Sequence, residues 1–124
     1  MANELTMSGS VKFAKSGTSV LVDFGTIQMD VAGSQYIHMV QSVPTSEEAI
    51  NLGTGGEIAA GGMFCARNLS TTNFVSIRQA TGAADLVRLD PLDFCIFRLD
   101  DDATAPFWIA DTAACEVEYL IIEP

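Results

Sequence analysis

Four short apolar runs between residues 63 and 99 constrain the fold of this chain more than any other feature. They recur about every ten residues, and each contains or ends beside an arginine. Turn-forming residues such as Asn, Gly, Pro and Asp separate them. Short strands at this spacing are typical of an all-β sandwich or barrel. The runs are Met63-Phe-Cys-Ala-Arg67, Phe74-Val-Ser-Ile-Arg78, Leu86-Val-Arg88-Leu89 and Phe94-Cys-Ile-Phe-Arg98-Leu99.

The rest of the chain reads as further short strands. The clearest covers residues 115–121, where Cys, Val, Tyr and Ile alternate with two glutamates, as in a strand with one buried side. Gly25 predicts a break or bulge in an early strand, and Pro44 ends the longest candidate, 34–43. About nine or ten strands and almost no helix predict a jelly-roll-like antiparallel β-sandwich.

The length of 124 residues fits a single domain whose core is large enough to be stable without disulfides or metal ions. We expect residues 10–124 to form the sandwich and residues 1–9 to form an extended segment. Such a segment can add a strand to a neighbour's sheet edge. The pattern of a signal peptide is lacking at the start, and no apolar stretch has transmembrane length.

A formal net charge of −10 excludes whole classes of partner. Nucleic-acid binding needs Lys and Arg to neutralise phosphates. An acidic chain without a basic stripe repels the phosphate backbone instead. Anionic membrane surfaces are disfavoured for the same reason. The charge does suit a protein that stays soluble at high concentration before it assembles.

Three cysteines, Cys65, Cys95 and Cys115, lie far apart in apolar runs. Neither paired Cys-x-x-Cys nor a Cys/His cluster occurs, so the spacing does not predict a zinc site. We expect three buried free thiols and folding in a reducing compartment.

No catalytic constellation accompanies the strands, and we expect neither an enzyme nor a cofactor. His38 is the only histidine, so no base–nucleophile pair is evident, and we predict a structural or interface role for it. The carboxylates cluster in turns or on one exposed strand face, where solvation explains them better than glycosidase chemistry.

Two segments allow a ligand as an alternative. Residues 54–62 are rich in Gly and Ala, but they lack the Lys-Ser/Thr of a phosphate loop, so a surface loop or tight strand crossing is the better interpretation. Residues 100–102 are three aspartates without the alternating pattern of a calcium loop. We expect an acidic turn there and leave a cation as the alternative.

The arginines are the more informative charges, because no lysine follows Lys15. Arg suits bidentate pairing and interfacial positions better than Lys does. Two interpretations stay open: pairing across strands with Asp85, Asp90, Asp93 or Glu118, or contacts with acidic groups of neighbouring subunits. In the last run, Phe94 and Ile96 share a side with an arginine, and Cys95, Phe97 and Leu99 line the other side. Both sides are therefore apolar, and one of them can face a partner. The arginines concerned are Arg67, Arg78, Arg88 and Arg98.

Residues 45–123 resemble small virion proteins of tailed bacteriophages. The segments that carry the resemblance are Arg67-Asn-Leu69, Thr72-Asn-Phe-Val-Ser-Ile77, Val87-Arg-Leu89, the run 94–99 and Glu118-Tyr-Leu-Ile121. One departure is Asp90-Pro-Leu-Asp93, where a Pro-Gly-acid turn would be expected. The resemblance implies a β-sandwich that coats capsids or attaches to tails, commonly as an oligomer and often as a trimer.

The resemblance leads us to expect a capsid decoration (cement) protein, made in the bacterial cytoplasm and located in the virion. Its partner would be the major capsid protein or another virion protein, and it would form a homo-oligomer, with a trimer favoured. The interface candidates are the four arginines, His38 and Trp108. Alternatives are a tail, collar or head-fibre component, or a carbohydrate-binding module built on Trp108, Phe107 and residues 100–102.

Overall fold

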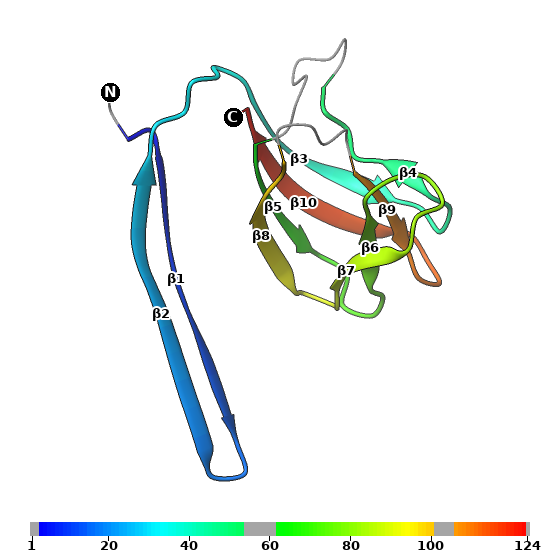
Figure 1. The fold of residues 1–124 in the computed structure, drawn as a ribbon. Helices are drawn as coiled ribbons and strands as arrows, with labels where there is room; N and C mark the ends of the chain where they lie inside the picture. Colours follow the sequence, from blue (N-terminus) through cyan, green and yellow to red (C-terminus); the bar gives the residue numbers. More distant parts are fainter. Residues whose placement is uncertain (1–2, 54–61, 101–105, 124) are drawn as a thin grey trace. The chain divides into compact units, whose positions relative to one another are not determined.

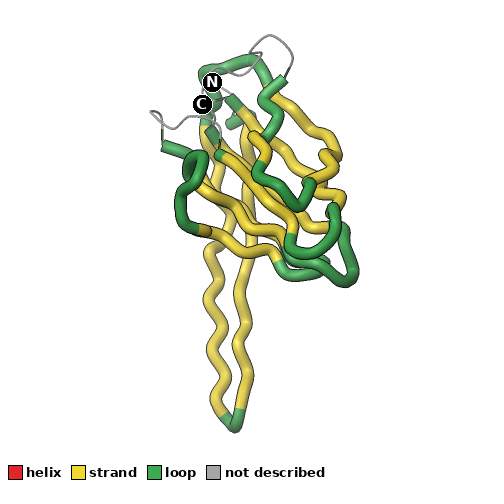
Figure 2. Tube along the Cα trace, turned by 90° about the vertical axis from the view of Figure 1, so that its right-hand side faces the viewer, coloured by secondary structure: helices red, strands yellow, loops and turns green. Residues whose placement is uncertain are grey.

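The computed structural model describes residues 3–53, 62–100 and 106–123 (Figure 1). Strands and loops make up all of this part of the chain (Figure 2). No helix long and apolar enough to cross a membrane occurs in these ranges. The ten strands are β1 (Leu5–Lys15), β2 (Thr18–Met29), β3 (Tyr36–Val43), β4 (Glu48–Ala49), β5 (Met63–Asn68), β6 (Val75–Arg78), β7 (Asp85–Leu89), β8 (Phe94–Arg98), β9 (Phe107–Ala110) and β10 (Cys115–Ile122).

The strands belong to two compact units. Met1–Ala32 holds β1 and β2, which pair with each other, and Gly33–Pro124 holds the other eight strands. The sequence led us to expect a division after residue 9, but the division falls after Ala32. The reason is that Leu5 to Ser8 pair with the last residues of β2, so they belong to a hairpin instead of a free segment.

The second unit is a sandwich of two four-stranded antiparallel sheets (Figure 1). One sheet has the order β3-β10-β5-β8 and the other β4-β9-β6-β7. Consecutive strands change sheet at every step except from β6 to β7, so the chain winds around a shared core. Eight strands in this order make a jelly roll, which confirms the predicted fold class.

The core between the sheets is centred on aromatic rings. Trp108 and Tyr119 are fully buried and meet edge to face, with ring centroids 5.3 Å apart. Phe64 packs against both rings. The Tyr119 hydroxyl donates a 2.6 Å hydrogen bond to the Asn51 carbonyl, and burial raises the pKa of Tyr119 to about 12. The alternation predicted for the last strand is confirmed, since its inward residues Cys115, Val117, Tyr119 and Ile121 are all buried.

One buried amide fixes a loop end of the sandwich. Asn68 ends β5 with its side chain fully buried, and its Nδ2 donates to the carbonyls of Asn73 (2.8 Å), Leu89 (3.1 Å) and Asp90 (3.3 Å). Its Oδ1 accepts the backbone N–H of Ser70 at 3.0 Å. The side chain therefore connects the loop after β5 to the end of β7 and to the loop that follows it.

The first unit is a long hairpin with two local devices. Ser16 and Gly17 connect its strands with φ of 51° and 82°, and two positive φ values are what a two-residue type I′ turn requires. Further along, the register shifts between Ser8 and Ser10, which leaves an extra residue in β2 next to Gly25, at φ 68°. The bulge predicted at Gly25 is thus confirmed.

The bulge makes the hairpin amphipathic. Side chains alternate sides along a strand, and an extra residue reverses the alternation in β2 while β1 continues unchanged. Apolar residues from both halves of β2 consequently share a side with those of β1. We call this side the apolar hairpin face: Leu5, Met7, Val11, Phe13, Val20, Val22, Ile27 and Met29. The opposite side carries Thr, Ser, Gln, Lys and Asp, with Leu21 as its large apolar residue.

Candidate interaction surface

The sheet formed by β3, β10, β5 and β8 has one side on the core and one side exposed to solvent. In β8, Cys95 and Phe97 pack on the core, while Phe94, Ile96 and Arg98 point outward. The two-sided apolar character predicted for this run is therefore present. The outward side chains, which we call the outer sheet face, are Tyr36, His38, Val40, Ser42, Met63, Cys65, Arg67, Phe94, Ile96, Arg98, Glu116, Glu118, Leu120 and Ile122.

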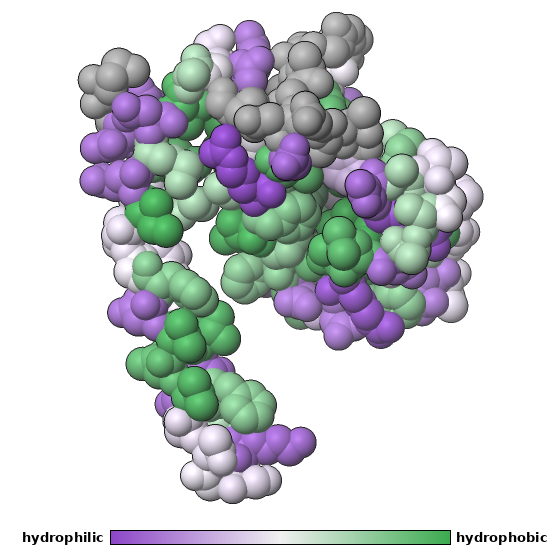
Figure 3. All heavy atoms as spheres, viewed as in Figure 1, coloured by the Kyte–Doolittle hydropathy of each residue, from purple (hydrophilic) through white to green (hydrophobic). Residues whose placement is uncertain are grey.

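Much of the outer sheet face is apolar and accessible. The exposed fraction is 68% for Tyr36, 66% for Phe94, 51% for Ile96 and 47% for Val40. Strand register places Leu120 and Cys65 in one row between His38 and Ile96, so apolar atoms run across the sheet. Figure 3 shows apolar side chains gathered over this side of the sandwich. A contiguous exposed patch of this kind marks a contact site more often than isolated surface residues do.

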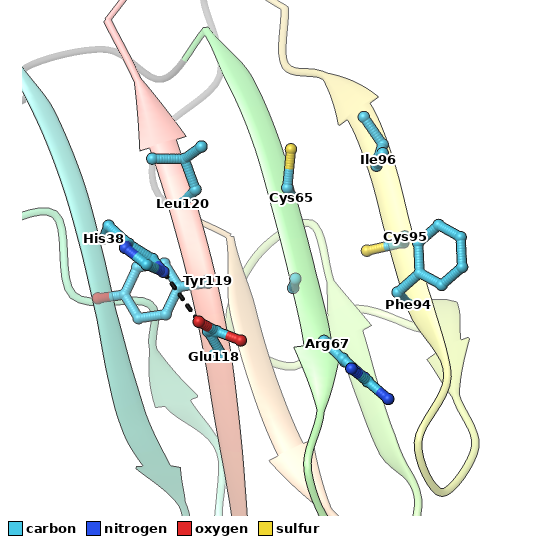
Figure 4. Close-up of a pocket in the computed structure, with 10 residues that line it drawn as sticks. His38, Cys65, Arg67, Phe94, Cys95, Ile96, Glu118, Tyr119 and Leu120 are labelled. Carbon is cyan, nitrogen blue, oxygen red and sulfur yellow. Dashed lines mark hydrogen bonds and ion pairs between the residues drawn. The ribbon is translucent and has the colours of Figure 1, made fainter. Parts of the chain in front are cut away.

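A shallow depression of about 200 Å³ lies in the outer sheet face. His38 and Glu118 form one side of it, and the His38 Nε2 lies 2.9 Å from the Glu118 Oε2 (Figure 4). Both side chains stay about half exposed. The contact with Glu118 on the neighbouring strand orients His38 on the sheet surface, and its role at an interface stays a prediction. Phe94 and Ile96 line the opposite side.

Arg67 lies beside Glu118 and Phe94 in the next row across the sheet. Figure 4 shows its guanidinium directed toward β8 and away from Glu118. No ion pair of Arg67 forms within the described ranges. The outer sheet face carries two arginines and two glutamates, whereas Gly33–Pro124 as a whole has four arginines and thirteen acidic residues. Its formal charges therefore balance, while the rest of the sandwich is acidic.

Arg78 and Arg88 lie on the other sheet and have partners within the chain. Arg78 bonds to Asp85 and, at 3.0 Å, to Glu47, whose carboxylate also accepts the Gly82 backbone N–H. The hydrogen bond from Arg78, followed by that from Gly82, holds the pKa of Glu47 below its ordinary value. This cluster ties the segment before β4 to the β6–β7 turn.

Arg88 bonds to Asp90 at 2.7 Å and places its guanidinium 3.7 Å from the centre of the Phe74 ring. Arg78 thus pairs across strands with Asp85, as one of the two open interpretations had it, whereas Arg88 pairs with Asp90 two residues further along the chain. The four arginines do not form one surface. Arg67 and Arg98 lie on the β3-β10-β5-β8 sheet, and the other two lie on the β4-β9-β6-β7 sheet.

Trp108 has no part in the surface. Its side chain is fully buried against Tyr119 and Phe64, so the expectation of an interface or carbohydrate-binding role is corrected. The run 107–110 is apolar at every position, and period-two alternation gives no sign of which residues point inward. Asp101, Asp102 and most of the Gly/Ala-rich segment lie outside the described residues.

The cysteines are free, as predicted, but they are not all buried. Cys115 is buried in the core, whereas Cys65 and Cys95 are half-buried on opposite sides of the β3-β10-β5-β8 sheet. Burial raises the pKa of the Cys65 thiol and raises that of Cys95 to about 11. Both thiols are consequently protonated and weak nucleophiles near neutral pH.

The described residues hold surface chemistry that suits a macromolecular contact. Within 3–53, 62–100 and 106–123, no three His, Cys, Asp or Glu side chains gather closely enough to hold a metal ion. Sequence reasoning identified His38, Arg67 and Arg98 but missed Val40 and Leu120, which only the pairing of β3 with β10 brings into the outer sheet face.

Comparisons with protein families, with curated proteins and with solved structures gave no match to the chain.

Proposed function

We propose that this chain is a non-enzymatic structural protein of a tailed-phage particle. Its role would be capsid decoration: binding to the shell of major capsid protein and stabilising it within the virion. The observation that carries the proposal is the outer sheet face, an exposed apolar patch with arginines on an otherwise acidic jelly roll. The phage context comes from the resemblance of residues 45–123 to small virion β-sandwich proteins.

The shape and chemistry of the outer sheet face favour a protein partner over a small ligand. Small-molecule sites are concave and enclose about 300–1,000 Å³, whereas this depression is shallow and holds about 200 Å³. Aromatic residues and arginine are enriched where proteins meet, and Tyr36, Phe94 and Arg67 supply both here. The acidic remainder of the sandwich would face solvent and keep unassembled copies apart.

Co-sedimentation with empty heads of the parent phage tests this proposal. Phe94→Ser combined with Ile96→Ser removes two exposed apolar side chains of the outer sheet face. Leu86→Ser is the matched control, because Leu86 is 76% exposed on β7 of the other sheet. Far-UV circular dichroism confirms that each variant folds.

We expect the unmodified chain and Leu86→Ser to pellet with heads, and the double variant to bind about thirtyfold or more weakly, as for loss of a central contact. Unbound wild-type protein, or equal binding by the double variant, would contradict the proposal. Pelleting with purified tails instead of heads would move the protein to the tail, collar or fibre alternative.

The carbohydrate-binding alternative lacks its stacking platform. That reading needed the exposed ring of Trp108, which the core encloses completely. A glycan array probed with the purified protein is therefore expected to give no hits.

A further inference from the structure

The hairpin of β1 and β2 is too small to be stable by itself in water. A single two-stranded hairpin is marginally stable at best, and units below about 40 residues usually need disulfides, metals or oligomerisation. The unit Met1–Ala32 contains no cysteine and no histidine. The structure thus requires an occupant that covers one side of the hairpin.

The apolar hairpin face is the side that needs cover. Val11, Phe13, Val20, Val22 and Ile27 expose 44–60% of their surfaces, and they follow one another along both strands. Figure 3 shows apolar side chains along β1 and β2. The Gly25 bulge indicates that this arrangement is specified, since without the extra residue the two halves of β2 would place their apolar side chains on opposite sides.

We propose that the apolar hairpin face packs against the same face of other copies of this chain. The face consists of Leu, Met, Val, Phe and Ile, and the register of β1 and β2 places one charged residue on its side, Lys15 beside the turn. Such a face is complementary to itself. The hairpin has two lysines and three acidic residues, whereas the sandwich has an excess of nine negative charges. Self-repulsion therefore opposes contact between sandwiches far more than contact between hairpins.

The area available fits such an interface. The five exposed side chains together present roughly 400 Å², taking about 150–200 Å² as the free area of each residue. An interface of standard size buries about 800 Å² per partner, with an apolar centre and a polar rim. The five residues supply that centre, and the polar side chains that flank them supply the rim. This inference rests on the hairpin alone and holds whether or not the outer sheet face binds a phage shell.

Sedimentation velocity of the full chain over a range of concentrations tests the inference. Phe13→Ser combined with Val20→Ser removes a directly paired cross-strand contact from the apolar hairpin face. Leu21→Ser is the matched control, because Leu21 is 65% exposed but lies on the opposite side of the hairpin.

We expect the unmodified chain and Leu21→Ser to sediment as a multimer of the 13.2 kDa chain. The double variant should dissociate at concentrations about thirtyfold higher or more. A wild-type chain that is still monomeric at about 100 μM, or an unchanged mass of the double variant, would overturn the inference.

Oxidative cross-linking gives a readout that does not depend on weakening the hairpin. Val20→Cys introduces a thiol into the apolar hairpin face, and Leu21→Cys introduces one on the opposite side. We expect Val20→Cys to form disulfides between its own new thiols in different copies, and Leu21→Cys to form few. A disulfide from Val20→Cys to the half-exposed Cys65 would instead place the hairpin on the outer sheet face and would refute self-packing.

Discussion

Asn68→Ala probes the jelly roll at its most connected polar side chain. The substitution removes three hydrogen bonds from Nδ2 and one to Oδ1. The bond to the Leu89 carbonyl is buried, and losing a buried hydrogen-bond partner costs about 1–3 kcal/mol. The other three backbone groups are partly accessible to water, and each lost bond costs about 0.5–1.5 kcal/mol.

The sum of these terms is a loss of about 2.5–7.5 kcal/mol, comparable with the 5–15 kcal/mol that stabilises an ordinary domain. For a unit of the size of Gly33–Pro124, each kcal/mol lowers Tm by roughly 4–8 °C, so we expect a decrease of at least about 10 °C. Denaturation in urea, followed by the fluorescence of the buried Trp108, measures the unfolding free energy directly. Because Trp108 is the chain's only tryptophan, the signal reports on the sandwich.

Two companion variants separate hydrogen bonding from packing. Asn68→Asp keeps the shape and the bond from Ser70 but turns a carboxylate oxygen toward three carbonyls, so we expect it to destabilise at least as much at pH 7. Asn51→Ala removes an amide whose Oδ1 accepts the Gly53 N–H in an exposed loop, its one side-chain bond among the described residues, and should cost less than about 1 kcal/mol. A near-neutral Asn68→Asp, or equal losses for Asn68→Ala and Asn51→Ala, would refute this reasoning.

Three further predictions concern buried and paired side chains. In urea denaturation, Trp108→Phe should lower the unfolding free energy by only about 1 kcal/mol, and Trp108→Ala by about 3–5 kcal/mol. The reason is that the Trp108 indole N–H is buried without an acceptor among the described residues, so Trp108→Phe loses no hydrogen bond there. Equal costs for the two variants would contradict this. Arg78 lowers the pKa of Glu47 in the folded state, so the stability that this carboxylate contributes is present above pH 4.5 and is lost as the pH falls through the folded pKa. The difference in unfolding free energy between wild type and Glu47→Gln should therefore shrink on acidification. A difference that stays constant with pH would count against this prediction. Cys95, with a pKa of about 11, should react with iodoacetamide at pH 8 far more slowly in the native protein than in urea, as peptide mass spectrometry would show; equal rates would place the thiol outside the sheet.

The local signals in the sequence predicted strands, turns and alternation well, because these depend on neighbouring residues. The inward set of β10, the stop at Pro44 and the bulge at Gly25 all follow from period-two alternation and from glycine and proline geometry. The opposite sides of Phe94 and Cys95 follow in the same way.

The distribution of strands between sheets could not be predicted, because it depends on pairing between residues far apart in the chain. Arg67 and Arg78 belong to similar runs, yet β5 and β6 lie in different sheets, so one arginine reaches the outer sheet face and the other is held by Glu47. The burial of Trp108 was hidden by a run that is apolar on both sides. The pairing of residues 5–8 with the end of β2 was not predicted, because residues 1–9 are mostly small or polar and resemble a free segment.

Electron cryo-microscopy of empty phage heads incubated with the purified protein tests the central claim most directly. The account predicts jelly-roll density on the outside of the shell, with Phe94, Ile96 and Arg67 of the outer sheet face turned toward the capsid protein. Bare heads at saturating protein concentration, or density in which β4, β9, β6 and β7 contact the shell instead, would contradict it.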